Sequence, residues 1–117
     1  MASELDLAVL RKLESAIGPE GIVELVGLME IELAARLAEF RRGVEQRDLP
    51  LARRAAHTLK SACSNLGARR YAQFCADTES AALRDDAEAL AAARPELERR
   101  AAQVLKELLA ERERLKP

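Results

Sequence analysis

The amino-acid composition predicts an all-α fold, and three observations carry this prediction. The 117-residue chain contains 23 alanines and 19 leucines, but only 10 valines, isoleucines and threonines together. Alanine and leucine lose little conformational freedom in a helix, whereas β-branched residues favour strands. Aromatic residues make up 3% of the chain, so leucine and alanine must fill the core. A chain of this length builds one core, and we expect a single helical domain over residues 1–117.

Charge and hydropathy exclude several classes of protein. Lysine and arginine total 19 against 20 aspartates and glutamates, which argues against a general nucleic-acid binder or a polybasic membrane anchor. No apolar run approaches the roughly 18 to 20 residues that a membrane span needs, and the first ten residues carry acid where a signal peptide carries base. Two cysteines are too few for a disulfide framework. We therefore expect a cytoplasmic protein with no membrane or nucleic-acid partner.

The first two helices are predicted on either side of Gly18. A short helix over about residues 3–17, with Ser3 and Asp6 as capping residues, is expected to end at Gly18, and Pro19 suits the first turn of the next helix. That second helix is long and runs to about residue 47. The apolar stripes that predict the two helices are Leu7, Leu10, Leu13 and Ile17, then Ile22, Val26, Met29, Leu33, Leu37, Phe40 and Val44.

Three further helices are predicted in the second half of the chain. One covers about residues 51–66 after Asp48 as a cap, and Gly67 separates it from another over about residues 68–83. The last carries apolar residues to Leu115 and begins near Asp85 and Glu88, a possible capping box. The inward residues of these last two helices are Tyr71, Cys75, Thr78 and Ala82, then Leu90, Leu97, Ala101, Val104, Leu108 and Leu115. Pro95 predicts a kink or a new helix start.

Short connections between long helices favour antiparallel neighbours. The sequence therefore predicts an up-and-down antiparallel four-helix bundle with a short additional N-terminal helix.

His57 is the single histidine of the chain, and helical geometry directs it away from the core. At about 100° per residue, the apolar residues of its helix fall on the face opposite the ring. That apolar face comprises Ala52, Ala55, Leu59, Ala62, Cys63 and Leu66, whereas Arg53, Arg54, Lys60, Ser61 and Ser64 lie within about 60° of the ring. The histidine is therefore expected to be exposed, among cations and small hydroxyl groups.

The surroundings of His57 favour phosphoryl chemistry over other uses of a histidine. Residues 53–70 contain five cations and no acid. Positive charge favours a neutral, nucleophilic ring at pH 7 and would balance a phosphoryl group attached to it. A metal site is disfavoured because no second histidine exists and no carboxylate lies one turn away. Cys63 projects to the far face, which disfavours a Cys–His pair. The simplest alternative is a solvated surface histidine.

The stretch from His57 to Ala68 reads HTLKSACSNLGA. It resembles the signature of histidine-containing phosphotransfer (HPt) domains, approximately H-x-L-K-G-[SA]-[SA]-x-x-L-G-A. The resemblance implies a monomeric helical bundle that relays phosphoryl groups in two-component phosphorelays. His57 matches the phosphoacceptor and Lys60 the lysine that stabilises the phosphoryl group. Ser61 departs from the pattern, because the family usually has glycine there. Glu79 falls where the family tends to carry Gln or Glu, which can orient the ring.

The resemblance also implies the partners. The phosphoryl group is expected to come from a phospho-aspartate in one receiver domain and to pass to an aspartate in another, and these receiver domains are expected to belong to a hybrid sensor kinase, to response regulators or to both. Docking is expected to use Arg53, Arg54 and Ser64 beside the histidine, with an apolar patch that includes Leu5 and Val9 from the first helix.

No enzyme activity or cofactor is expected of the domain itself. Its five glycines form no phosphate-cradling loop, and no acidic cluster suggests a Mg²⁺ site, so Mg²⁺ is expected on the partner receiver domain. Two alternatives remain open from the sequence. One is an adaptor that binds receiver domains without accepting phosphate, which the unusual Ser61 favours, and the other is a helical dimerisation module.

Overall fold

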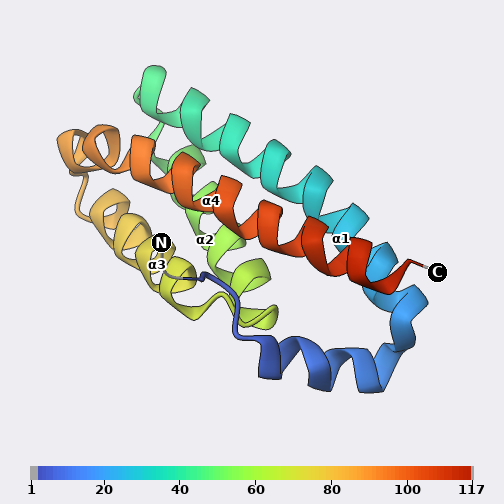
Figure 1. Cartoon of the computed structure of the whole chain (residues 1–117). Coiled ribbons are helices and arrows are strands. Elements are labelled where there is room, and N and C mark those ends of the chain that lie inside the picture. The colour runs from blue at the N-terminus through green and yellow to red at the C-terminus, as the bar shows by residue number, and fades with distance from the viewer. Residues whose placement is uncertain (1–2, 117) are drawn as a thin grey trace.

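A computed structural model describes residues 3–116 and confirms the all-α prediction. Four helices and no strand are found in this part of the chain (Figure 1). They are α1 (Leu7–Glu45), α2 (Leu49–Asn65), α3 (Arg69–Leu83) and α4 (Ala87–Leu115). No helix among the described residues has the length and apolar character needed to cross a membrane.

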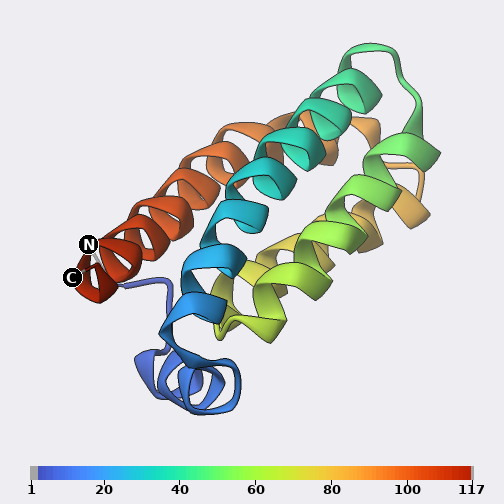
Figure 2. The same cartoon turned by 90° about the vertical axis from the view of Figure 1, so that its right-hand side faces the viewer.

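The four helices form an elongated bundle of 47 × 24 × 21 Å. Each helix packs against the next along the chain, and α1 also packs against α4, so the four surround a common core. Short connections join α1 to α2 at one end and α2 to α3 at the other (Figure 2). The largest fully buried side chains are Leu10, Val26, Phe40, Leu59, Cys63, Tyr71, Cys75, Leu90, Leu97, Val104 and Leu108. Most of them belong to the predicted apolar stripes.

α1 bends sharply at Gly18, where the sequence predicts a helix end. Gly18 has φ 78° and ψ 168°, a left-handed φ that favours glycine. Residues 7–17 therefore turn across the end of the bundle, as the blue segment of Figure 2 shows. Leu10 is buried there, but Leu7 is 50% exposed and Ile17 45% exposed, so the two ends of the apolar stripe do not pack in the core. Because the segment crosses the end of the bundle, only the middle of its stripe meets the core.

Aspartates cap three of the helices. Asp6 accepts a hydrogen bond from the backbone N–H of Ala8, and Asp48 accepts one from Leu51, as predicted. The cap of α4 is Asp86, which accepts from the N–H of Ala89. The predicted capping box at Asp85 and Glu88 is therefore wrong by one residue, because Asp85 lies in the preceding turn with a φ of 55°.

α4 passes through Pro95 as one helix, so of the two predicted alternatives, a kink or a new helix start, the structure excludes the new helix start. Leu90 and Leu97 lie on either side of the proline and are both buried in the core. We infer that packing on both sides stabilises the helix across the missing N–H group of the proline.

α1 and α2 approach closely near their connection. A Cβ atom added to Gly43 would lie 2.6 Å from the backbone nitrogen of Ala52, closer than real contacts allow. Only glycine permits this separation, and it brings α1 against α2 at Ala52, on the buried face of α2.

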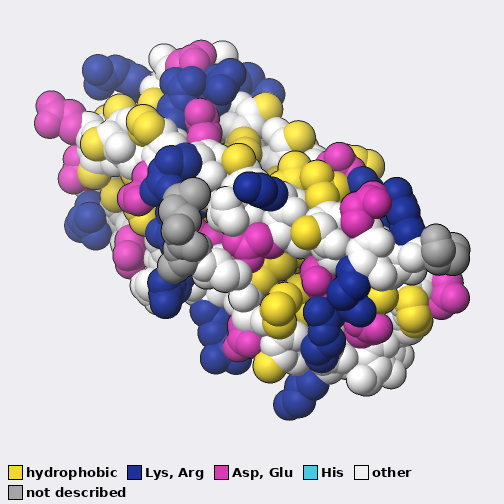
Figure 3. All heavy atoms as spheres, viewed as in Figure 1, with side chains coloured by type: hydrophobic (Ala, Val, Ile, Leu, Met, Phe, Trp, Pro, Cys, Tyr) yellow, Lys and Arg dark blue, Asp and Glu magenta, His cyan; other side chains and the backbone are white. Residues whose placement is uncertain are grey.

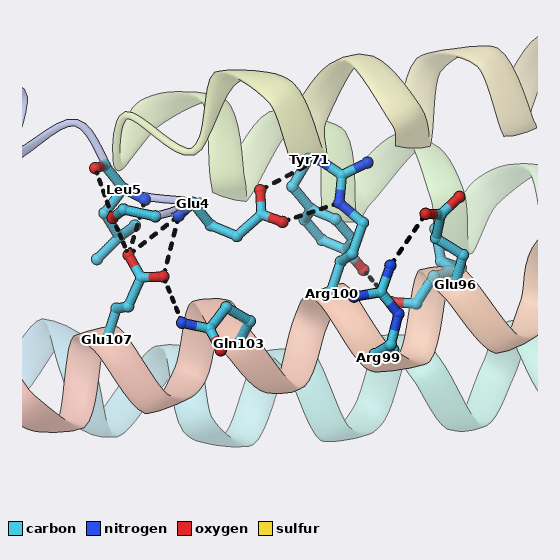
Figure 4. A network of polar contacts seen from close by, with 10 residues as sticks. Glu4, Leu5, Tyr71, Glu96, Arg99, Arg100, Gln103 and Glu107 are labelled. Carbon is cyan, nitrogen blue, oxygen red and sulfur yellow. Dashed lines mark hydrogen bonds and ion pairs between the residues drawn. The ribbon is translucent and has the colours of Figure 1, made fainter. Parts of the chain in front are cut away.

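The first described residues form a strap, Ser3–Asp6, that fastens to α4 (Figure 4). Glu107 accepts hydrogen bonds from the Ser3 hydroxyl at 2.6 Å and from the backbone N–H groups of Glu4 and Leu5 at 2.9 and 3.0 Å. The Asp6 N–H donates to the carbonyl of Gly67 at 3.1 Å. The strap thus connects the end of α4 with the turn between α2 and α3.

Glu4 and Arg100 form a second fastening of the strap. The Arg100 guanidinium donates two hydrogen bonds to the Glu4 carboxylate, at 2.8 and 3.1 Å, and lies over the rings of Tyr71 and Phe74. Leu5, between these polar contacts, is 6% exposed. Elsewhere on the same face of the molecule, positive and negative side chains are interspersed (Figure 3).

Candidate functional site

α2 presents His57 to solvent, as its helical position predicts. The His57 side chain is 55% exposed. The opposite face of the helix is buried against the core and comprises Ala52, Ala55, Ala56, Leu59 and Cys63. Burial of this apolar face fixes the rotation of α2 about its axis, and with it the outward direction of the histidine.

Glu79 of α3 orients the imidazole ring. Nδ1 of His57 lies 2.9 Å from Oε2 of Glu79, whose side chain is only 14% exposed. An ionised carboxylate can only accept a hydrogen bond, so Nδ1 carries the hydrogen and donates it. Nε2 is then left with a free lone pair, and no hydrogen bond within residues 3–116 involves it.

Lys60 shares the same carboxylate. Its Nζ lies 3.4 Å from Oε1 of Glu79, while the other carboxylate oxygen holds His57. The lysine lies one helical turn beyond the histidine, and its side chain is 36% exposed. The structure therefore brings His57, Lys60 and Glu79 together in one cluster, which we call the site cluster.

A groove extends from His57 across α2 towards α1. It has a volume of about 490 Å³. Arg53 and Arg54 line it, together with His57 and Glu79, and α1 adds Arg36 and Glu39. The sequence did not indicate the two α1 residues. The helical positions of residues on α2 show only which residues of that same helix lie near His57. The segment 53–70 contains no acid, but the surroundings of His57 in the fold do contain acids. Glu39 of α1 and Glu79 of α3 both line the groove.

The remaining predicted residues divide into exposed and buried ones. Ser61 and Ser64 are exposed on α2. Leu5 is buried, so its prediction as part of an exposed docking patch is wrong, because the strap places its side chain in the core. Val9 is half-buried and lies against the turn at Gly67. The large exposed apolar residues of α1 include Leu28 and Ile31, at 58% and 69% exposed, which sequence analysis did not single out.

The cysteines are not available as nucleophiles. Both Cys63 and Cys75 are buried and free, and burial raises the pKa of each thiol to about 12. Cys63 faces the core, away from His57, as predicted. Among residues 3–116, no group of three or more His, Cys, Asp or Glu side chains is placed to hold a metal ion.

The fold and the site cluster define a class of protein: a small all-α domain that presents one oriented histidine on an exposed helix face. The sequence model of the Hpt domain family matches residues 24–114, and the chain belongs to this family. Hpt domains are phosphotransfer carriers that work with receiver domains in two-component phosphorelays.

A solved structure resembles the chain over nearly its whole length. The crystal structure of histidine-containing phosphotransfer protein B from Pseudomonas aeruginosa PAO1 superimposes with a TM-score of 0.89 at 29% sequence identity. The match covers 97% of this chain and 98% of that chain. No curated protein matches the sequence. Together with the family match, this structure supports a histidine phosphotransfer carrier in phosphorelays.

Proposed function

We propose that His57 accepts a phosphoryl group from a phospho-aspartate in the receiver domain of a hybrid sensor kinase or a response regulator. His57 then passes the group to an aspartate in another such receiver domain. The observation that carries this proposal is the 2.9 Å contact between Nδ1 and Glu79, made by a ring that is 55% exposed. The contact leaves Nε2 as the nucleophile and leaves it accessible to a partner.

The transfer step is a substitution at phosphorus. The Nε2 lone pair forms the N–P bond while the bond between phosphorus and the aspartyl oxygen breaks, and the aspartate leaves as a carboxylate with the electron pair. The ring keeps its hydrogen on Nδ1 and gains a positive charge. The Glu79 carboxylate stabilises that charge, as a buried acid stabilises an imidazolium in other histidine mechanisms. Transfer to the second receiver domain reverses the step.

Lys60 and Ser61 influence the transfer without forming or breaking a bond themselves. The Lys60 ammonium is only 3.4 Å from Glu79 and is mobile on its stem, so it is placed to turn towards the phosphoryl oxygens once they are attached. Ser61 adds a small side chain on the exposed face where the family usually has glycine, and it narrows the approach of the partner. Arg53, Arg54 and Ser64 contact the docked receiver domain.

The proposal extends to properties that the family implies for the whole chain. It is one domain over residues 1–117 with up-and-down antiparallel topology, in which residues 7–17 serve as the additional helix. It works as a monomer in the cytoplasm, without catalytic turnover of its own. It binds no nucleotide or metal, and the Mg²⁺ that transfer requires is held by the receiver domain.

Replacement of the phosphoacceptor gives the direct test. A receiver domain phosphorylated with radiolabelled acetyl phosphate is incubated with the wild-type chain and with His57→Gln. We expect the wild type to acquire a label that is stable in alkali and lost in acid, as phosphohistidine is, and the variant to acquire none. Because His57 is exposed, the variant keeps its fold, which circular dichroism checks. A label that persisted in His57→Gln would remove His57 from the role.

A further inference from the structure

The groove beside His57 has a side that the phosphotransfer chemistry does not use. Lys60 and Glu79 occupy the immediate surroundings of the ring. The rest of the groove leads away from the ring to α1, where Arg36 and Glu39 line it. The inference below rests on the proposed function and concerns how this site selects its partner.

Arg36 is held in the groove by ion pairs that leave it incompletely satisfied. One terminal nitrogen, Nη1, lies 2.9 Å from Oε1 of Glu39, and Nε lies 3.5 Å from Oε1 of Glu32. Within residues 3–116, Nε is buried and has no hydrogen-bond partner, so a docking partner cannot reach it. The Arg36 side chain as a whole is 28% exposed, and an acidic group of a partner would meet the outer part of the guanidinium, where Nη1 pairs with Glu39.

The groove also carries an excess of positive charge. Three arginines line it, Arg36 among them, against the two glutamates Glu39 and Glu79. Glu79 already serves His57 and Lys60. Within residues 3–116, neither Arg53 nor Arg54 forms an ion pair. An anionic group entering the groove would therefore meet cations that have no acid of their own.

We propose that this groove binds an acidic side chain of the docking receiver domain, and that Arg36 is a specificity-determining residue. Arg36 exchanges the carboxylate of Glu39 for that of the partner. The planar guanidinium fork suits bidentate binding of a carboxylate. The groove runs from the His57 ring to α1. Arg36 is therefore placed to contact the body of the docked receiver domain and not the transferred phosphoryl group.

Two substitutions on α1 test this exchange, and they have opposite expected signs. Phosphoryl transfer is measured from the receiver domain that labels the wild type, over a range of receiver concentrations. Arg36→Gln is expected to raise the half-saturating concentration roughly fivefold, without lowering the maximal rate, because one partly exposed charge pair with the partner is lost. Glu39→Gln is expected to lower that concentration, because it frees Arg36 for the partner. The effect of Arg36→Gln is expected to shrink at high salt.

The matched control is Arg41→Gln. Arg41 is another α1 arginine in an ion pair, but its partner is Glu98 of α4. The control is expected to leave the half-saturating concentration unchanged. Urea denaturation of the three variants checks that each is folded.

A small phosphoryl donor separates docking from chemistry. Phosphoramidate transfers its phosphoryl group to imidazole as its P–N bond breaks and ammonia leaves, and it needs no protein partner. Arg36→Gln is expected to be phosphorylated by phosphoramidate at the wild-type rate. An unchanged half-saturating concentration in Arg36→Gln, a slower reaction of that variant with phosphoramidate, or weaker binding in Glu39→Gln would each overturn the inference. A wild-type chain that no donor labels at His57 would instead overturn the proposed function.

Discussion

Two polar clusters of this molecule are each built around a glutamate, but they differ in what they leave open. Glu107 of α4 accepts hydrogen bonds from Ser3, Glu4 and Leu5 of the strap, and from Gln103 of its own helix. Among the described residues, the side chain of Glu79 of α3 holds only the His57 ring and the Lys60 ammonium. Both carboxylates are partly or largely shielded from solvent, so burial does not distinguish them.

The difference lies in the groups that remain unused. The donors around Glu107 all belong to this chain, and those from Ser3, Glu4 and Leu5 fasten the strap to the bundle. In the site cluster, His57 keeps an unused nitrogen, and within residues 3–116 neither Arg53 nor Arg54 of the adjoining groove forms an ion pair. A cluster whose hydrogen-bonding groups all have partners within the chain stabilises the fold. A cluster with unpaired groups is available to a partner protein. Three predictions follow the comparison from its largest expected effect to its smallest.

Removal of each carboxylate is expected to lower the free energy of unfolding by a different amount in the two clusters. Glu107→Ala leaves several donors of the strap without an acceptor and is expected to lower the free energy of unfolding by about 2 kcal/mol. Glu79→Ala is expected to lower it by less than about 0.5 kcal/mol, because its partners are surface groups that water can solvate. Urea denaturation of both variants measures the difference. Equal losses would show that the site cluster is also a structural fastening.

The opposite contrast is expected in phosphoryl transfer. Glu79→Gln keeps an acceptor for Nδ1 but removes the charge that stabilises the phosphorylated ring, so its maximal transfer rate is expected to fall roughly tenfold. Asp77→Asn serves as the control, because Asp77 is an exposed acid of the same helix that contacts Gln73. Transfer at saturating receiver concentration gives the rates. A wild-type rate in Glu79→Gln would leave this glutamate without a role in the reaction.

The smallest expected effect is a dependence of stability on pH. Burial of Glu107 opposes its ionisation, but the hydrogen bonds from Glu4, Ser3, Gln103 and Leu5 outweigh burial and lower its pKa below the ordinary 4.5. A group with a lowered pKa in the folded state contributes stability above the unfolded pKa, and this stability is lost as the pH falls through the folded value. The wild type is therefore expected to lose stability as the pH drops from about 5 through 4.5 and below.

The variant Glu107→Gln isolates the contribution of this carboxylate. It is expected to show a shallower loss of stability over the same pH range, measured by urea denaturation at pH 6, 4 and 3. The bond from Arg11 lowers the pKa of Glu111 as well, so part of the slope is expected to remain. A slope identical to that of the wild type would mean that the strap does not depend on the ionised form of Glu107.

The helices and the direction of His57 were predictable from sequence because both depend on periodicity within one helix. The stripes of α1 and α4 identified most of the core, and the projection of α2 placed the ring outward. The sequence was less informative where contacts come from elsewhere in the chain. Leu5 lies in a strap whose fastening to α4 is distant in sequence, and Leu7 belongs to a segment redirected at Gly18.

The site was predictable only in part for the same reason. The HPt signature covers residues 57–68, which are the second half of α2 and the turn that follows it. Glu79 of α3 was identified because it matches a position of the family. No pattern within one helix could indicate that Arg36 and Glu39 share a groove with the histidine. Their proximity depends on the packing of α1 against α2 rather than on the sequence around either residue.

The contact at Gly43 links that packing to the choice of partner. Any side chain at this position would act as a wedge against the backbone of Ala52 and would force the two helices apart. Arg36 and Arg53, which stand on opposite walls of the groove, would separate with them. A substitution at a residue that does not line the groove would then appear as altered pairing between signalling proteins, with every residue of the site cluster unchanged.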